Sequence, residues 1–163
     1  DQANEAAANA GAVSRVLQAI GDARNAQQAY SAALEAVRSS FGWAYGSFWE
    51  HDSRENCLKF SVESGSVTPE FRAVTASARF REGEGLSGRA WRQRDLVFVP
   101  NIGEVTDCVR APAATRAGVK SGVCFPIVVG GKVLGTMDFF ALETLTPSPE
   151  RLDALRNVGR MVS

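Results

Sequence analysis

Three cysteines carry the most reactive side-chain type in this chain, and one of them has a charged neighbour. Cys108 lies two residues before Arg110, in a stretch rich in Gly and Pro. A nearby guanidinium favours thiolate, so Cys108 is either a redox or adduct-forming group or a small, partly buried side chain. Cys57 and Cys124 fall in strand-like segments and are expected to be buried thiols. We therefore predict that Cys108 is the most reactive of the three.

The single histidine, His51, lies beside Asp52 at the end of an aromatic segment. Imidazole is a common axial ligand of haem iron, but a histidine next to a polar turn is typical of a solvated surface. The cysteine and histidine positions are scattered, so no metal site is expected. Arg110, Arg116 and Lys120 share one stretch and either hold an anionic ligand or are solvated charges.

The segment Gly83–Gly88 satisfies G-x-G-x-x-G, and Asp107 follows it at the distance of a dinucleotide fingerprint. That fingerprint requires a buried strand before its first glycine, whereas residues 78–82 are short and charged. The flanking pattern also consists of hairpins rather than a βαβ unit. We therefore interpret the glycines as structural: they allow a tight turn, and Gly88 allows a helix to pack closely on the sheet.

Composition limits the function classes. The chain has 163 residues, 45% hydrophobic and 22% charged, as in a globular domain. Lys plus Arg (18) equals Asp plus Glu (18), which argues against nucleic-acid binding. The longest apolar stretch, 124–129, is too short to insert in a membrane, and the N-terminus is not a secretory signal. Few cysteines point to a cytoplasmic setting, and the sequence looks like a piece of a longer chain.

Periodicity predicts the elements that position these residues. Two apolar runs around Gly130–Gly131 predict a hairpin, whereas 101–120 is expected to be a long loop with a helical turn or two. The order of the elements predicts an α+β fold with a mainly antiparallel sheet and helices at both chain ends. Helices are expected over 1–40 with a break at 21–22, over 69–78 and 86–94, and after 149; strands over 42–51, 57–62, 79–81, 96–100, 121–129 and 132–141.

Four segments stand out in order along the chain: the aromatic strand FGWAYGSFWEHD, the turn GEGLSGRAW, the strand VFVPN, and the closing hairpin SGVCFPIVVGGKVLGTMDFF. In this order and spacing they resemble a GAF domain over roughly residues 24 to 143, and the turn is similar to the family's GEGLxGRA. Asn101 stands where the family more commonly has Asp.

The resemblance implies a central antiparallel sheet of five or six strands, with the N- and C-terminal helices on one face and a ligand pocket of helices and a loop on the other. The loop over 101–120 would close over that pocket. Alternation alone does not fix which strand face lines it, and the aromatic candidates are equally suited to the core. The candidate ligand-binding residues are Phe48, Trp91, Phe98, Asp107, Cys108, Val109, Arg110, Phe125 and Phe139.

Some branches of the family fit less well. Cys108 is not followed by the histidine of bilin-attaching members, and the Asn-Lys-Phe-Asp-Glu pattern of cyclic-nucleotide binders does not occur in the sequence. Free methionine sulfoxide reductases have a cysteine in the glycine-rich turn, where this chain has Ser87. We therefore expect a non-catalytic domain with no assignable cofactor.

The resulting hypothesis is a cytoplasmic sensory domain of a chemoreceptor or histidine kinase. A signalling helix (1–22) would precede the GAF domain (23–145), and a C-terminal helix (146–163) would lead to an output domain. The alternatives are a ligand-free dimerisation module and a thiol-dependent free methionine sulfoxide reductase. A parallel homodimer is expected through two apolar stripes, formed by Val13, Val16, Leu17 and Ile20 and by Leu152, Leu155, Val158 and Met161.

Overall fold

The computed structural model describes residues 2–162, which form one antiparallel sheet between two layers of helices. The helices are α1 (Gln2–Gly21), α2 (Ala26–Phe41), α3 (Pro69–Ser77), α4 (Gly85–Gln93), the 3₁₀ turn η1 (Ile102–Glu104), α5 (Ala111–Arg116) and α6 (Pro149–Val162). The strands are β1 (Tyr45–Asp52), β2 (Cys57–Gly65), β3 (Arg79–Phe80), β4 (Val97–Val99), β5 (Gly122–Val129) and β6 (Lys132–Phe140).

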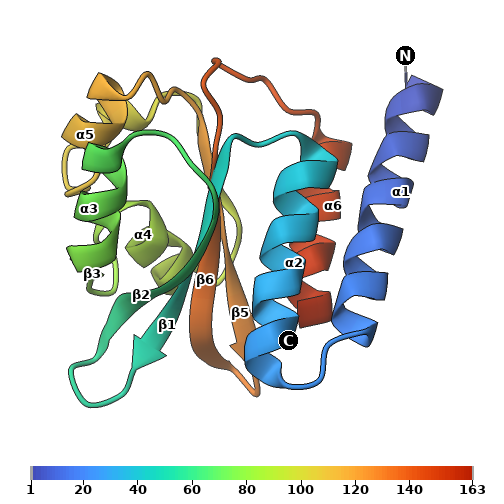
Figure 1. The fold of residues 1–163 in the computed structure, drawn as a ribbon, viewed down its shortest axis with the longest axis horizontal. Helices are drawn as coiled ribbons and strands as arrows, with labels where there is room; N and C mark the ends of the chain where they lie inside the picture. Colours follow the sequence, from blue (N-terminus) through green and yellow to red (C-terminus); the bar gives the residue numbers. More distant parts are fainter. Residues whose placement is uncertain (1, 163) are drawn as a thin grey trace.

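The sheet has six strands in the order β3–β2–β1–β6–β5–β4, and each neighbouring pair is antiparallel. Helices α1, α2 and α6 cover one face, which we call the helix face (Figure 1). Helices α3, α4 and α5 cover the other, which we call the loop face (Figure 1). The predicted α+β fold, with terminal helices on one face, is confirmed.

Local signals start and stop the helices where the sequence indicates. The side chain of Asn25 caps α2 by accepting from the backbone N–H of Gln28, and Gly42 ends that helix with φ +77°. Thr68 caps α3 in the same way, followed by Pro69 at the first helical position. These caps fix both ends of α2, just before β1, and the start of α3 on the loop face.

The glycine-rich turn is a packing device. A Cβ on Gly88 would lie 2.3 Å from the carbonyl oxygen of Arg81, so only glycine permits α4 to start this close to the turn. The backbone N–H of Gly83 donates to the carbonyl of Gly88 at 2.8 Å. The preceding strand β3 has two residues and pairs antiparallel with β2, so the βαβ context of a dinucleotide site is missing here.

The helix face is closed by apolar packing. Helix α1 packs against α2 and α6, and α6 packs against β5. Val16 of α1 and Leu155 and Val158 of α6 are fully buried within the chain, so much of both predicted dimer stripes is used internally. Leu17 remains 56% exposed on α1. Among the described residues, no helix is long and apolar enough to cross a bilayer.

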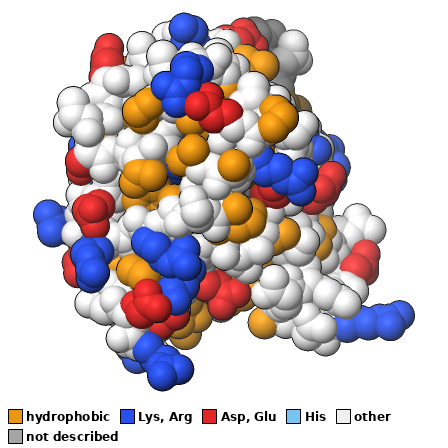
Figure 2. Space-filling view, turned by 60° about the vertical axis from the view of Figure 1, so that its left-hand side comes forward, with side chains coloured by type: hydrophobic (Ala, Val, Ile, Leu, Met, Phe, Trp, Pro, Cys, Tyr) orange, Lys and Arg blue, Asp and Glu red, His pale blue; other side chains and the backbone are white. Residues whose placement is uncertain are grey.

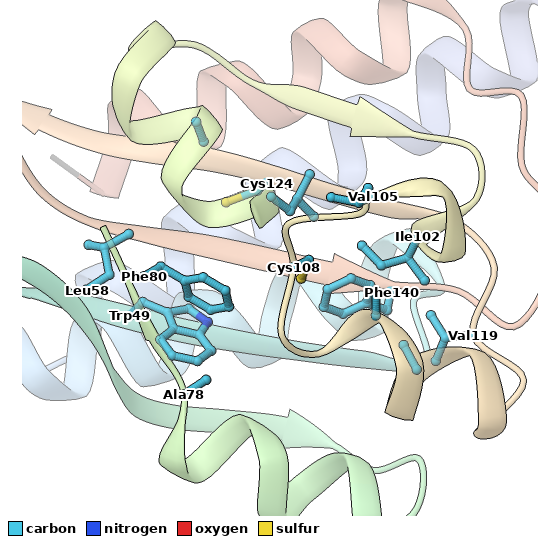
Figure 3. Close-up of a cluster of buried hydrophobic side chains, with 14 of the residues drawn as sticks. Trp49, Leu58, Ala78, Phe80, Ile102, Val105, Cys108, Val119, Cys124 and Phe140 are labelled. Carbon is cyan, nitrogen blue, oxygen red and sulfur yellow. The ribbon is translucent and has the colours of Figure 1, made fainter. Parts of the chain in front are cut away.

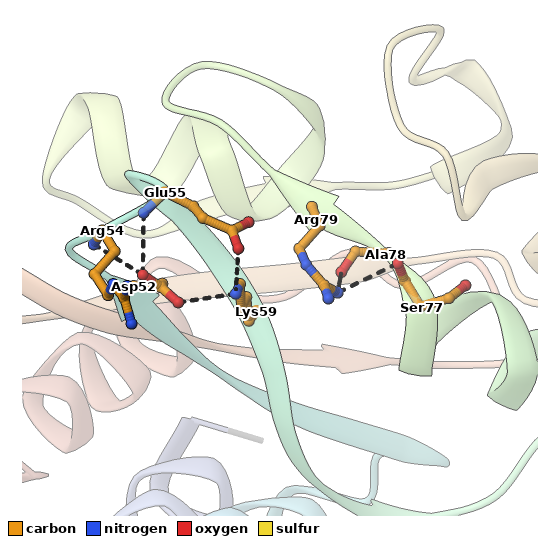
Figure 4. Close-up of polar contacts among 7 residues, drawn as sticks. All are labelled: Asp52, Arg54, Glu55, Lys59, Ser77, Ala78 and Arg79. Carbon is orange, nitrogen blue, oxygen red and sulfur yellow. Dashed lines mark hydrogen bonds and ion pairs between the residues drawn. The ribbon is translucent and has the colours of Figure 1, made fainter.

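At the far end of the first hairpin, Asp52 organises the β1–β2 turn (Figure 4). Its Oδ1 accepts from the backbone N–H groups of Arg54 and Glu55 at 2.8 and 3.1 Å, and its Oδ2 lies 2.8 Å from Nζ of Lys59. The hydrogen bond from Lys59, followed by those from the backbone, lowers the pKa of Asp52 to about 2.

Candidate functional site

The interior of the loop face contains a connected group of polar side chains around Asp138. Nη2 of Arg110 donates to its Oδ2 at 2.5 Å, and Ser87 donates to the same oxygen at 3.4 Å. The hydroxyl of Ser47 donates to the other oxygen, Oδ1. The indole N–H of Trp49 is shared between Asp138 Oδ2 (3.0 Å) and Ser47 (2.9 Å). We call these five residues the polar cluster.

Elements far apart in sequence supply the polar cluster. Ser47 and Trp49 occupy alternate positions of β1, so both point to the loop face. Asp138 lies on β6 directly opposite Ser47 in the strand ladder. Ser87 comes from the first turn of α4, and Arg110 immediately precedes α5. The glycine-rich turn and the long loop therefore each bring one polar side chain onto the two central strands.

The charged pair in this cluster is fully enclosed. The side chains of Arg110 and Asp138 are 1% and 0% exposed. Burial by itself lowers the pKa of Arg110, but the carboxylate of Asp138 more than offsets it, so that pKa lies above its ordinary value. Burial, reinforced by the charge of Asp138, also raises the pKa of Tyr45, so its phenol stays protonated and can donate a hydrogen bond.

On this face, Nε of Arg110 is buried without a hydrogen-bond partner among the described residues. The buried hydroxyls of Tyr45 and Thr75 face each other and that of Thr136 faces the thiol of Cys124, but none of the three makes a hydrogen bond of normal geometry. Folded proteins pair nearly all buried polar groups, and each unpaired one costs about 1–3 kcal/mol. Their accumulation around one ion pair distinguishes this region from an ordinary core.

A cavity of about 240 Å³ opens on the same side, beside the β2–α3 connection. Tyr45 and Phe71 line it, with their rings edge to face at 5.2 Å, and Glu63 and Arg72 form an ion pair of 3.1 Å within the lining. Figure 2 shows this side of the molecule, where charges of both signs are interspersed with small hydrophobic patches. The cavity is close to the size range of small-molecule sites.

Five of the nine residues predicted to bind ligand lie on the loop-face side. Trp91, Cys108 and Arg110 are buried there. Asp107 is partly exposed and forms an ion pair with α4, and Val109 is 52% exposed. The structure thus brings Arg110 into the polar cluster and leaves two other candidates, Asp107 and Val109, at the surface of the loop.

The other four candidates lie on the opposite face of the sheet from Arg110, so the structure does not bring all nine together. The reason is physical: the apolar stripes of α1, α2 and α6 need an apolar sheet face, and these rings supply it. Tyr30 of α2, for example, stacks on the ring of Phe48 with centroids 4.5 Å apart. The four residues, all packed on the helix face, are Phe48, Phe98, Phe125 and Phe139.

The long loop packs over the sheet, but side chains fill the space beneath it, where the sequence predicted a ligand pocket. Ile102, Val105, Cys108 and Val119 all pack inward from this loop (Figure 3). Figure 3 shows Cys108 next to Phe140 of β6. The cavity lies to one side of the loop, at α3, instead of directly under it.

The loop position does not leave Cys108 more accessible than the other thiols. Cys108 and Cys57 are each 4% exposed, and Cys124 is fully buried; all three are free. The guanidinium of Arg110 is paired with the carboxylate of Asp138, which competes with Cys108 for its positive charge. Burial, with a further contribution from Asp138, raises the pKa of Cys124, so that thiol is protonated. The burial of Cys108 agrees with the reading of it as a small buried side chain, and the ranking by reactivity stays a prediction.

His51 sits at the end of β1, where its Nε2 lies 2.9 Å from the side-chain oxygen of Asn56. Its ring meets that of Trp91 edge to face at 5.1 Å. In the part of the chain that the structure describes, no group of three or more Cys, His, Asp or Glu side chains is arranged to hold a metal ion.

Sequence reasoning missed Asp138, Ser47 and Trp49 as site residues. One signal for Asp138 was present: it is the only charged residue between Val133 and Ala141 in an otherwise apolar strand. A carboxylate in such a position requires a buried partner. The identity of that partner, Arg110, has no local signature.

Among curated proteins, the chain is 31% identical over 88 residues to the basic helix-loop-helix protein A of Pisum sativum and to a truncated form of it. The aligned part is 53% of this chain, but only 14% of the length of the full relative and 25% of the truncated form.

Among solved structures, the chain is similar to the free methionine-R-sulfoxide reductase of Neisseria meningitidis, with a TM-score of 0.80 and 17% identity over 97% of this chain and 87% of that one. A second similar structure is the GAF domain of a phosphoenolpyruvate-protein phosphotransferase from Coxiella burnetii, with a TM-score of 0.80 and 15% identity, covering 94% and 89% of the two chains. At these identities the likeness shows the fold alone.

A model of the GAF domain family matches residues 23–163. The match includes α6, which the sequence analysis had set apart from the domain, and it leaves out α1. Because it covers most of the chain and agrees with the observed fold, this protein belongs to the GAF domain family.

Proposed function

We propose that this chain is a sensory domain of a cytoplasmic signal-transduction protein, of the chemoreceptor or histidine-kinase type. A small molecule binds on the loop face, and the change is passed through the terminal helices to an output domain. The fold family supports a sensory role, and three free cysteines fit a reducing compartment.

The observation that carries this proposal is the buried polar cluster with its unpaired neighbours. A buried ion pair is weak support for stability, because well-packed apolar residues of similar volume often stabilise a fold equally well or better. The unpaired Nε of Arg110 and the three poorly satisfied hydroxyls on this face add further cost. A binding role accounts for that cost, because a ligand supplies the missing partners.

The central strands offer a short path from this cluster to the helices. Ser47 and Trp49 belong to the polar cluster, whereas Phe48 between them points to the helix face and stacks on Tyr30 of α2. On β6, Asp138 faces the cluster, while its neighbours Met137 and Phe139 pack on the helix face. A shift of β1 or β6 on ligand binding therefore reaches α2 through one layer of side chains.

We propose that the domain is not an enzyme, in spite of its structural likeness to a reductase. Thiol chemistry requires an accessible thiolate, and the three thiols are buried. Ser87, in the turn where the reductase branch has a cysteine, donates a hydrogen bond to Asp138. Chromatographic loss of free methionine sulfoxide in the presence of a thiol reductant would contradict this proposal.

Native mass spectrometry of the domain after incubation with fractionated metabolite extract tests the sensory function. We expect a small-molecule adduct on the wild type and loss of it in Asp138→Asn. The matched control is Met137→Leu, a conservative change at the adjacent residue that faces the opposite side. A domain that dimerises and carries no adduct from any fraction would instead favour the ligand-free dimerisation module.

A further inference from the structure

The guanidinium of Arg110 is surrounded by aromatic rings from four different elements. Its Cζ lies 4.8, 5.0, 5.5 and 5.8 Å from the ring centroids of Trp49, Phe140, Phe80 and Phe71, respectively. We call these four residues the aromatic cage. All four rings are fully buried. Trp49 and Phe80 also contact each other edge to face at 5.0 Å.

An aromatic cage with a carboxylate at its end is a receptor for cations. The faces of aromatic rings carry negative potential, and several rings around one point attract a positive charge strongly when water is excluded. Asp138 adds a full negative charge 2.5 Å from the guanidinium. The ring faces and the carboxylate of Asp138 would both repel an anionic ligand, which argues against an anion in this site.

The side chain inside the cage, that of Arg110, comes from the loop and not from the sheet. Arg110 immediately precedes the short helix α5, next to the exposed Val109. Besides Arg110, this segment is held by the buried small side chains of Cys108 and Ala111 on either side of it. Two exposed ion pairs add little: Asp107 with Arg89 of α4 at 2.9 Å, and Arg116 with Glu70 of α3 at 2.6 Å.

We propose that the aromatic cage and Asp138 form a binding site for a small organic cation with a guanidinium or alkylammonium group, and that Arg110 is an internal occupant which this ligand replaces. This inference rests on the proposed sensory function and specifies its ligand class. The hydroxyls of Tyr45 and Thr75 are buried nearby and make only a weak contact with each other, so their oxygens can accept hydrogen bonds from further N–H groups of the ligand.

Replacement of Arg110 also provides the switch. When the ligand's cation takes its place, the guanidinium leaves the cage together with the start of α5. The loop then loses the anchor that Arg110 provides, while Asp138 remains paired. The charge inside the domain is the same in both states, so the exchange avoids leaving a buried carboxylate unpaired.

The cage itself is tested in Arg110→Ala, which leaves it empty. We expect millimolar methylguanidinium to raise the melting temperature of this variant by roughly 3 °C or more, because it binds only the folded state. Urea, a neutral molecule of similar shape, should give no rise. In the matched double variant Arg110→Ala/Asp138→Asn, the rise should disappear. If Arg110→Ala does not fold alone, the yield of refolding with methylguanidinium against urea gives the same comparison.

The replacement step is tested in the wild type with agmatine, followed by the indole N–H signal of Trp49 in NMR. A saturable shift of that signal is expected. Equal effects of methylguanidinium and urea on Arg110→Ala, a rise that persists in the double variant, or no agmatine response in the wild type would each overturn the proposal. Failure of the sensory function is a different result: no metabolite fraction of any charge class gives an adduct.

Discussion

The two faces of the sheet use the same strands but different chemistry. On the helix face, β1, β5 and β6 present Phe48, Phe125 and Phe139 to apolar helices. On the loop face, Asp138 of β6 forms a buried charged pair with Arg110 from the long loop. Unpaired polar atoms occur on the helix side as well, at Asn9, Trp43 and Arg151, but among the residues that the structure describes no fully buried charge accompanies them there.

The difference indicates how the domain divides its tasks. Apolar packing on the helix face stabilises the fold without demanding a specific partner for each group. The loop face carries polar groups whose burial is favourable only while each charge keeps its counter-charge. A face with that requirement can change state when a ligand changes the pairing, whereas an apolar face resists such a change.

Removing one charge of the buried pair should give the largest effect. We expect Asp138→Ala to lower the free energy of unfolding by about 3–5 kcal/mol, because it leaves the guanidinium of Arg110 buried without a partner. Urea denaturation measures this loss. The double variant Arg110→Met/Asp138→Leu removes both charges and should recover most of it. A loss below about 1 kcal/mol for Asp138→Ala would mean that the pair is not enclosed as described.

A truncation on the helix face should cost slightly less and leave ligand binding alone. Leu155 of α6 is fully buried, so Leu155→Ala is expected to cost about 2–5 kcal/mol through the cavity it creates. Leu155→Met, which nearly conserves volume, should cost less than about 1.5 kcal/mol. At temperatures where Leu155→Ala is folded, its adduct in native mass spectrometry should equal that of the wild type; loss of the adduct would argue against separate tasks for the faces.

Two glycines sharpen the comparison further. Gly88→Ala would place Cβ 2.3 Å from a backbone oxygen, whereas Gly159→Ala would place it 2.9 Å from the ring of Phe125. The backbone of Arg81 cannot yield as a side chain can, so we expect Gly88→Ala to destabilise by about 1–3 kcal/mol. Gly159→Ala should cost less, because the ring of Phe125 can shift; the preference of alanine for a helix, about 1 kcal/mol, is common to both sites. Thermal unfolding of both variants measures the two losses of stability. A larger loss for Gly159→Ala than for Gly88→Ala would contradict the packing described.

The β1–β2 turn lies outside both faces and gives a smaller, pH-dependent effect. The pKa of Asp52 is lowered from 3.8 to about 2 in the folded state, so its contribution is present above about pH 4 and is lost as the pH falls toward 2. An NMR titration should show the amide signals of Arg54 and Glu55 moving in that window. Asp52→Asn, which keeps an oxygen acceptor but no charge, should abolish the movement; a midpoint near 4 in the wild type would refute the interaction with Lys59.

Self-association is expected to involve the outer side of the helix layer. We propose a parallel homodimer through α1 and α6, and Leu17→Glu should weaken it in sedimentation equilibrium at about 100 µM. Val16 is unsuitable for this test, because it is fully buried. Leu134 of β6, 41% exposed, is the matched control position. A wild-type monomer, or equal effects of Leu17→Glu and Leu134→Glu, would contradict this interface.

The fold was accessible from the sequence, because its signals are local. The Gly130–Gly131 turn has positive φ at both residues, as a tight hairpin requires, and Pro69 starts α3 as predicted. The order of hairpins and helices then determined the class of fold and the placement of the terminal helices on one face.

The site was less accessible, because it depends on which face each strand presents. Alternation places Phe48 and Trp49 on opposite faces of β1, but it does not say which face the helices cover. The pairing of Arg110 with Asp138 joins a loop to a central strand across 28 positions. No propensity or spacing rule encodes that contact, so only the folded structure identifies the polar cluster.

The division between the faces can be tested with two indole N–H signals in one NMR spectrum. Trp49 lies in the polar cluster on the loop face, and Trp43 is buried on the helix face. The domain should be titrated with the metabolite fraction that gives an adduct in native mass spectrometry. We predict a large shift for Trp49 and a small one or none for Trp43. A shift confined to Trp43 would contradict the account and place the binding site among the terminal helices.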